Sequence, residues 1–131
     1  MAKSWAYGAV TVLIAHLLWL ALILTQANAD WVMPAIVMML FVIINIAGIA
    51  AFVTALRAPR DPILLGLTMA PLTAVIATAG NLLLVASGTH LNFAGAGGSL
   101  DLFFVALTYG FFVAAIGASL GAWLRQRRAA P

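Results

Sequence analysis

Four long apolar runs divide the chain, and short polar segments separate them. The runs cover about residues 5–24, 31–56, 63–86 and 102–124, and none of them contains Asp, Glu, Lys or Arg. A helix rises about 1.5 Å per residue, so about 20 residues cross the roughly 30 Å hydrocarbon layer of a bilayer. The pattern therefore predicts an all-α integral membrane protein, with four transmembrane helices packed as a bundle in a single domain over residues 1–131.

Composition supports a lipid environment. With 66% hydrophobic and 7% charged residues, the 131-residue chain has too little polar surface to cover a water-soluble globule. The net charge of +3 does not indicate nucleic acid, because the basic residues flank the apolar runs and form no continuous basic face. The chain has no cysteine, which excludes disulfides, thiolate nucleophiles and Cys-ligated metals.

The breaks between the runs carry residues that favour helix ends. Asp30 can cap the second helix, Asp61 precedes a proline at the start of the third, and Ser99 or Asp101 can open the fourth. The remaining loop, over residues 87–101, is rich in glycine and is predicted to be non-helical.

All the basic residues fall in segments that share one side of a four-crossing chain, namely Lys3, Arg57, Arg60, Arg125, Arg127 and Arg128. The positive-inside rule makes that side the cytoplasm. We therefore expect a multi-pass protein of the cell inner (plasma) membrane with both termini cytoplasmic.

A cleaved secretory signal is an alternative for the first run. Lys3, the apolar stretch and the A-x-A-like site at Ala27 and Ala29 imitate such a signal. The run is longer than the usual apolar region of a signal peptide, which favours a retained helix.

Small residues recur at four-residue spacing in the second, third and fourth helices. Lipid tails are as apolar as Leu, so helix association in a bilayer depends on the close backbone approach that small residues allow. Two stripes suffice for packing within one chain, and a third can serve a partner helix from another membrane subunit or a second copy. The expected packing positions are Ala47, Ala51, Gly66, Ala70, Ala74, Gly110, Ala114, Gly117 and Gly121.

His16 lies near the expected bilayer midplane, since eleven residues separate it from Trp5. A polar group at that depth needs a partner or a cavity. Asn45 lies at a broadly similar depth, and a hydrogen bond between the two is the simplest interpretation. No cofactor is predicted; a haem or quinone site at His16 is the alternative, although His90 in the outer loop is too far away to complete a bis-His haem.

Further polar residues gather toward the outer half of the membrane. Asn81, Thr108 and Tyr109, with His90 and Asn92 in the loop above them, can line a small outward-facing vestibule. Interfacial tyrosine and contacts between helices explain the same residues without a vestibule. No convergent set of ligands predicts a metal site.

Pro71 lies within the third helix, where it removes one backbone hydrogen bond and favours a kink. Thr68 and Thr73 lie close enough in sequence to satisfy carbonyl groups that the proline leaves free. Such a kink can hinge a transporter or shape a bundle.

These observations favour a non-catalytic accessory or structural subunit of a larger inner-membrane complex, respiratory or transport. The chain has no glutamate, no acidic residue at membrane depth and no recognised catalytic motif, so we do not expect an enzyme. One alternative is a small homo-oligomeric transporter or channel for a neutral or lipid-like solute. The other is a haem or quinone protein that uses His16.

Overall fold

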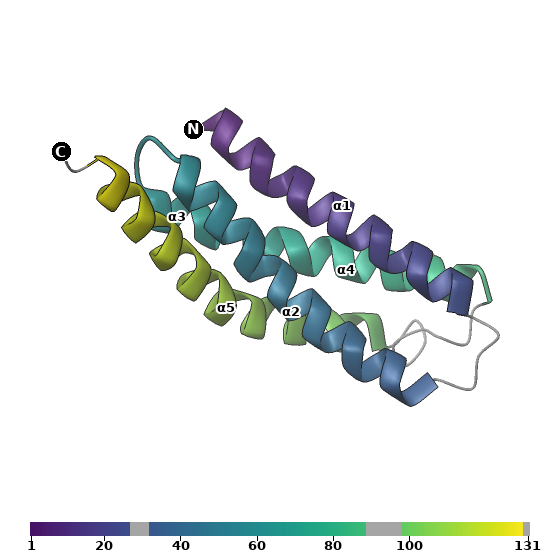
Figure 1. Ribbon diagram of the computed structural model, residues 1–131. Helices are drawn as coiled ribbons and strands as arrows, with labels where there is room; N and C mark the ends of the chain where they lie inside the picture. The colour runs from purple at the N-terminus through teal and green to yellow at the C-terminus, as the bar shows by residue number, and fades with distance from the viewer. Residues whose placement is uncertain (27–31, 89–97, 130–131) are drawn as a thin grey trace.

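The computed structural model describes residues 1–26, 32–88 and 98–129, with the side chains of these residues apart from 22, 25, 26 and 32–44. Across these ranges the chain is helical apart from short turns, and none of them forms a strand. The all-helical prediction is confirmed. Five helices follow one another (Figure 1): α1 (Ala2–Gln26), α2 (Val32–Arg57), α3 (Pro62–Leu67), α4 (Met69–Ala86) and α5 (Gly98–Ala129).

Three helical segments are long and apolar enough to cross a bilayer: Ala2–Ala21, Pro62–Ala86 and Gly98–Ala129. In α2, the part with described side chains is the shorter apolar helix Asn45–Arg57. These lengths and compositions are those of a helical membrane protein.

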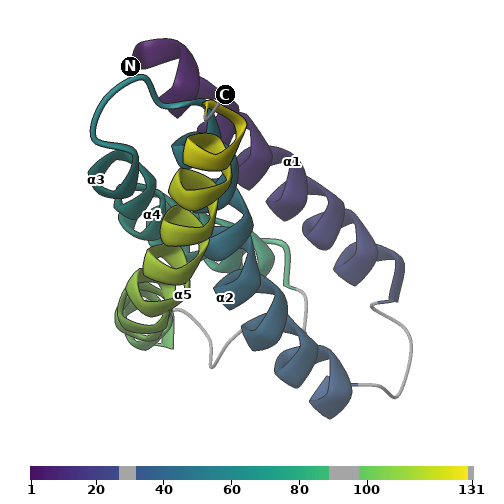
Figure 2. The same cartoon turned by 60° about the vertical axis from the view of Figure 1, so that its left-hand side comes forward.

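α2 lies between α1 and α5 (Figures 1 and 2), and the α3–α4 pair contacts both of these helices. α1 packs on α2, α3 and α4, whereas α5 packs on α2, α3 and α4 and, within the described ranges, does not contact α1. Two hydrophobic clusters fill the interior: one includes Trp19 and Leu102, and the other includes Val12 and Met69.

The start of α1, the end of α5 and the α2–α3 turn lie at one end of the molecule (Figure 1). Ser4 Oγ donates to Arg57 O at 2.8 Å, and the Arg125 guanidinium donates to the carbonyl groups of Ala58 and Pro59. The basic segments therefore share one end, which we call the basic end. The side of the membrane that this end faces stays a prediction.

The helix ends differ from the expected caps. α3 begins directly after Asp61, but Asp61 has a left-handed backbone (φ 45°) and its side chain caps no amide. α5 is already helical at Gly98, so Ser99 and Asp101 lie within its first turn and do not precede it. Asp30 lies outside the described residues.

Candidate functional site

His16 belongs to the inward stripe of α1. The buried positions of that helix are spaced by four, four, four, three and four residues, which places them on one face. They are Ser4, Gly8, Val12, His16, Trp19 and Ile23. His16 is only 4% exposed and lies between Val12 of one hydrophobic cluster and Trp19 of the other.

The two ring nitrogens of His16 have different surroundings. Nδ1 lies 2.8 Å from Val12 O, one turn earlier in α1. A carbonyl oxygen only accepts hydrogen bonds, so Nδ1 carries the proton and a neutral ring keeps its lone pair on Nε2. Nε2 is buried and has no hydrogen-bond partner in the described part of the chain.

The expected hydrogen bond between His16 and Asn45 is therefore not made through Nε2. Asn45 instead lines a groove between α2 and α5, and its side chain is exposed. The prediction matched the two residues by depth alone. The rotation of each helix about its own axis also decides which way a side chain points. Similar depth does not bring two side chains together.

The expected vestibule residues are also separated. Asn81 is fully buried, and its Nδ2 donates to Ser99 Oγ at 2.8 Å. Thr108 and Tyr109 are exposed on α5, about 14 and 15 Å along the helix from Ser99 by the rise per residue. The described residues do not bring Asn81 together with Thr108 and Tyr109, and the vestibule stays a prediction because His90 and Asn92 lie outside the described residues.

All three stripes of small residues are buried within this chain. The expected packing positions Ala47, Ala51, Gly66, Ala70, Ala74, Gly110, Ala114, Gly117 and Gly121 all lie in its interior. Each stripe packs on a neighbouring helix of the chain, and a partner helix from another subunit or a second copy stays a prediction.

The third apolar run is interrupted at Thr68, three residues before Pro71, and this interruption separates α3 from α4. Pro71 cannot donate to the carbonyl four residues earlier. Thr68 Oγ1 donates to Leu65 O at 2.6 Å and Thr73 Oγ1 to Met69 O at 2.7 Å, so neither hydroxyl satisfies the carbonyl of Leu67. Trp5 Nε1 of α1 donates to Thr68 Oγ1 at 3.2 Å, which ties α1 to the break.

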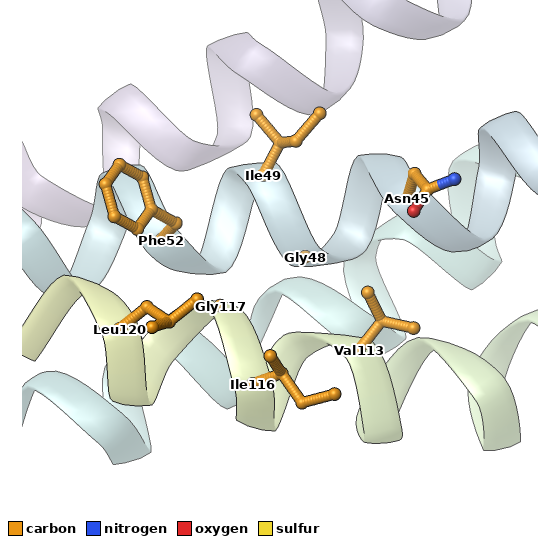
Figure 3. Close-up of a pocket in the computed structure, with 8 residues that line it drawn as sticks. All are labelled: Asn45, Gly48, Ile49, Phe52, Val113, Ile116, Gly117 and Leu120. Atoms are coloured by element: carbon orange, nitrogen blue, oxygen red, sulfur yellow. The ribbon is translucent and has the colours of Figure 1, made fainter.

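A groove of about 270 Å³ runs between α2 and α5 (Figure 3). Its floor is where Gly48 and Gly117 bring the two backbones together: a Cβ added at Gly117 would overlap the Gly48 carbonyl group. Apolar side chains form its walls and Asn45 stands at one end. The lining residues are Asn45, Gly48, Ile49, Phe52, Val113, Ile116, Gly117 and Leu120.

Sequence reasoning missed this groove. It identified Gly117 as a packing residue, but it did not pair it with Gly48. The available signal was a glycine in each of two apolar runs, and only the register of the two helices shows that these glycines meet.

A second surface lies on α5 toward its N-terminal end. It carries exposed aromatic rings and hydroxyl groups, and we call it the aromatic face: Phe104, Thr108, Tyr109, Phe111 and Phe112. Phe112 is 74% exposed and Tyr109 57% exposed.

The described residues hold no group of three or more His, Asp or Glu side chains that could bind a metal ion. No protein-family model, curated protein or solved structure matches this chain. Function is therefore proposed from the geometry of the chain itself.

Proposed function

We propose that this chain is a non-catalytic subunit of a larger membrane complex, which it joins through the aromatic face of α5. The observation that carries the proposal is the exposure of Tyr109 and its aromatic neighbours at membrane depth. The small-residue stripes already pack inside the chain, so the aromatic face is the better candidate for this contact.

The aromatic face lies in the half of the membrane opposite the basic end. Tyr109 is eighteen residues before Arg127, about 27 Å along α5, and so lies just within the far boundary of a roughly 30 Å hydrocarbon layer. Tyrosine usually lies at the membrane interface, where water or headgroups reach its hydroxyl group. In hydrocarbon an unsatisfied hydroxyl costs free energy, whereas a partner helix can accept its hydrogen bond.

The aromatic composition of this face fits the same role. Aromatic side chains are enriched at protein interfaces, and Trp and Tyr are enriched among binding hot spots, which cost about 2 kcal/mol or more when truncated. Phe112 is the most exposed of these rings, so we expect it to be a principal contact.

Photo-crosslinking in native membranes tests this proposal. A photoreactive phenylalanine analogue at position 109 should crosslink to one unlike membrane protein, whereas the same analogue at Leu83, exposed on α4, should not. Phe112→Ala should reduce recovery of that partner in mild detergent about 30-fold, as expected for a loss of about 2 kcal/mol. Leu83→Ala is the matched control.

Crosslinking of position 109 only to lipid, or to another copy of this chain, would contradict the proposal. The second of these outcomes would favour the homo-oligomeric alternative.

A haem or quinone site at His16 is a second candidate function, and the arrangement of the ring favours it. A histidine that ligates a metal commonly donates its other N–H to a backbone carbonyl, as Nδ1 does to Val12 O. Nε2 could then ligate haem iron, or accept a hydrogen bond from a quinol hydroxyl group. For a six-coordinate haem, a second ligand would have to come from elsewhere in the chain or from a partner.

Purification of the native complex separates the two candidates. A haem at His16 would give a Soret band that His16→Leu abolishes while the chain stays inserted in the membrane. A quinone there would be recovered by solvent extraction from the wild-type complex but not from the variant. Unchanged cofactor content in His16→Leu would exclude this function.

A further inference from the structure

The α5 face that forms one wall of the groove continues beyond the groove toward the basic end. Ile116 and Leu120 of the groove wall are followed by Trp123 and Arg127, at intervals of four, three and four residues. Such spacing places all four side chains on one face of a helix. An apolar channel, an aromatic ring and a cation therefore lie in line.

Arg127 is stacked on Trp123. The guanidinium carbon lies 4.1 Å from the ring centroid. A guanidinium that stacks through its flat face keeps the N–H donors at its edge available for an oxyanion, and arginine binds phosphate by paired hydrogen bonds. Arg125, by contrast, is already bonded to the carbonyl groups of the α2–α3 turn.

The surrounding charge also favours an anion. Among the described residues, the basic end carries six basic side chains and one acidic side chain, Asp61. Arg60 and Arg128 are exposed there, and no ion pair forms within the described part of the chain. Each basic residue near a membrane surface contributes about 1 kcal/mol to the binding of anionic lipid.

From these features we infer that the α2–α5 groove binds an anionic phospholipid, with one acyl chain along the groove and the phosphate at Arg127. Ile116 and Arg127 are separated by eleven residues, about 16 Å of helix. Half of the hydrocarbon layer is about 15 Å, so a phosphate at the headgroup level puts the acyl chain beside the groove.

The size of the groove suits a single chain. At about 270 Å³ it is smaller than the roughly 300–1,000 Å³ of sites for drug-sized molecules. A partner helix is a less suitable occupant of the groove. With its side chains a helix is about 10 Å wide, and a purely apolar helix would make no use of Arg127. The inference is independent of the aromatic face, which lies farther toward the N-terminal end of α5.

Native mass spectrometry of the purified chain in detergent can measure the binding. The probes are dioleoyl-phosphatidylglycerol and dioleoyl-phosphatidylcholine, which share acyl chains and differ in net charge. Phosphatidylglycerol should bind more tightly to the wild type. Arg127→Gln should weaken its binding about fivefold and leave phosphatidylcholine unaffected.

Arg57→Gln is the matched control, because it removes the same charge from the same end. The Arg57 guanidinium stacks on Tyr7 of α1 at 4.1 Å, away from the groove. Equal weakening by both substitutions would show that only net charge matters and would overturn the site.

The acyl chain is tested separately. Ile116→Trp should fill the groove and weaken both lipids, whereas Leu18→Trp, at an exposed position of α1, should weaken neither. If Ile116→Trp fails to fold, Ile49→Trp on the opposite wall makes the same test. Unchanged lipid binding in a folded groove variant would also overturn the proposal.

Discussion

Gly117→Ala tests the close backbone contact between α2 and α5 at Gly48. A Cβ at this position would overlap the carbonyl oxygen of Gly48 and lie 2.9 Å from its carbonyl carbon and 3.2 Å from its Cα. These are backbone atoms, which cannot rotate away as a side chain can. α2 and α5 would have to move apart along their shared contact, and we expect the protein to be destabilised.

Gly80→Ala is the matched control, since it makes the same change at a buried position of α4. There the added Cβ would lie 3.7–4.0 Å from three atoms of the Leu20 side chain, which is ordinary van der Waals contact. Alanine is favoured over glycine in a helix by about 0.5–1 kcal/mol at either position. That gain cancels in the comparison, so the difference between the variants isolates the clash.

Overpacking a well-packed interior costs about 1–3 kcal/mol. We therefore expect Gly117→Ala to unfold at lower denaturant than Gly80→Ala, with free energies of unfolding that differ by about that amount. Unfolding by sodium dodecyl sulfate in mixed micelles, followed by tryptophan fluorescence, measures the difference. Equal stability of the two variants would show that the backbones of α2 and α5 do not meet at Gly48.

Three other predictions address the remaining contacts and the topology. Ser99→Ala removes the hydroxyl group that accepts from Asn81 and should lower the free energy of unfolding by about 0.6 kcal/mol, whereas Ser119→Ala, at an exposed position, should not. Arg125→Gln removes two hydrogen bonds to the α2–α3 turn and should speed amide hydrogen exchange there about fivefold, which corresponds to about 1 kcal/mol; unchanged exchange would contradict a stabilising role. Reporter fusions at the C-terminus and in the loop after α4 should report cytoplasm and exterior respectively, and a cytoplasmic signal from the loop would refute the topology.

The helices could be predicted from the sequence because crossing a bilayer requires long apolar runs. Their ends were harder to predict. α5 extends from Gly98 to Ala129, beyond the expected range of 102–124, because helical hydrogen bonding does not stop where hydrophobicity does. The third run suggested a kink at Pro71, but only the structure places the interruption at Thr68.

The sequence predicts how deep each candidate residue lies in the membrane, but it does not predict which way its side chain points. Counting residues from a helix end gives a position along the membrane normal, and it gave similar depths for His16 and Asn45. It does not give the rotation of each helix, which depends on packing against all of its neighbours. The structure turns His16 inward and Asn45 toward the α2–α5 groove.

For the stripes of small residues, the sequence predicts a close helix contact but does not identify the helix on the other side of it. A small residue at four-residue spacing marks a close helix contact, but it does not say whether the second helix belongs to the same chain. Here Gly66 lies against Ala118 and Gly117 against Gly48, so these contacts are all internal. We therefore expect any recognition of another molecule to use the larger side chains that remain outside, such as Phe112 and Ile116. On a lipid-facing surface most such side chains need no partner, and only those accompanied by a hydroxyl group or a cation give a reason to expect one. The aromatic face and the groove whose α5 wall leads to Arg127 meet this condition, whereas the exposed Leu13, Ile14, Leu17 and Leu18 of α1 do not.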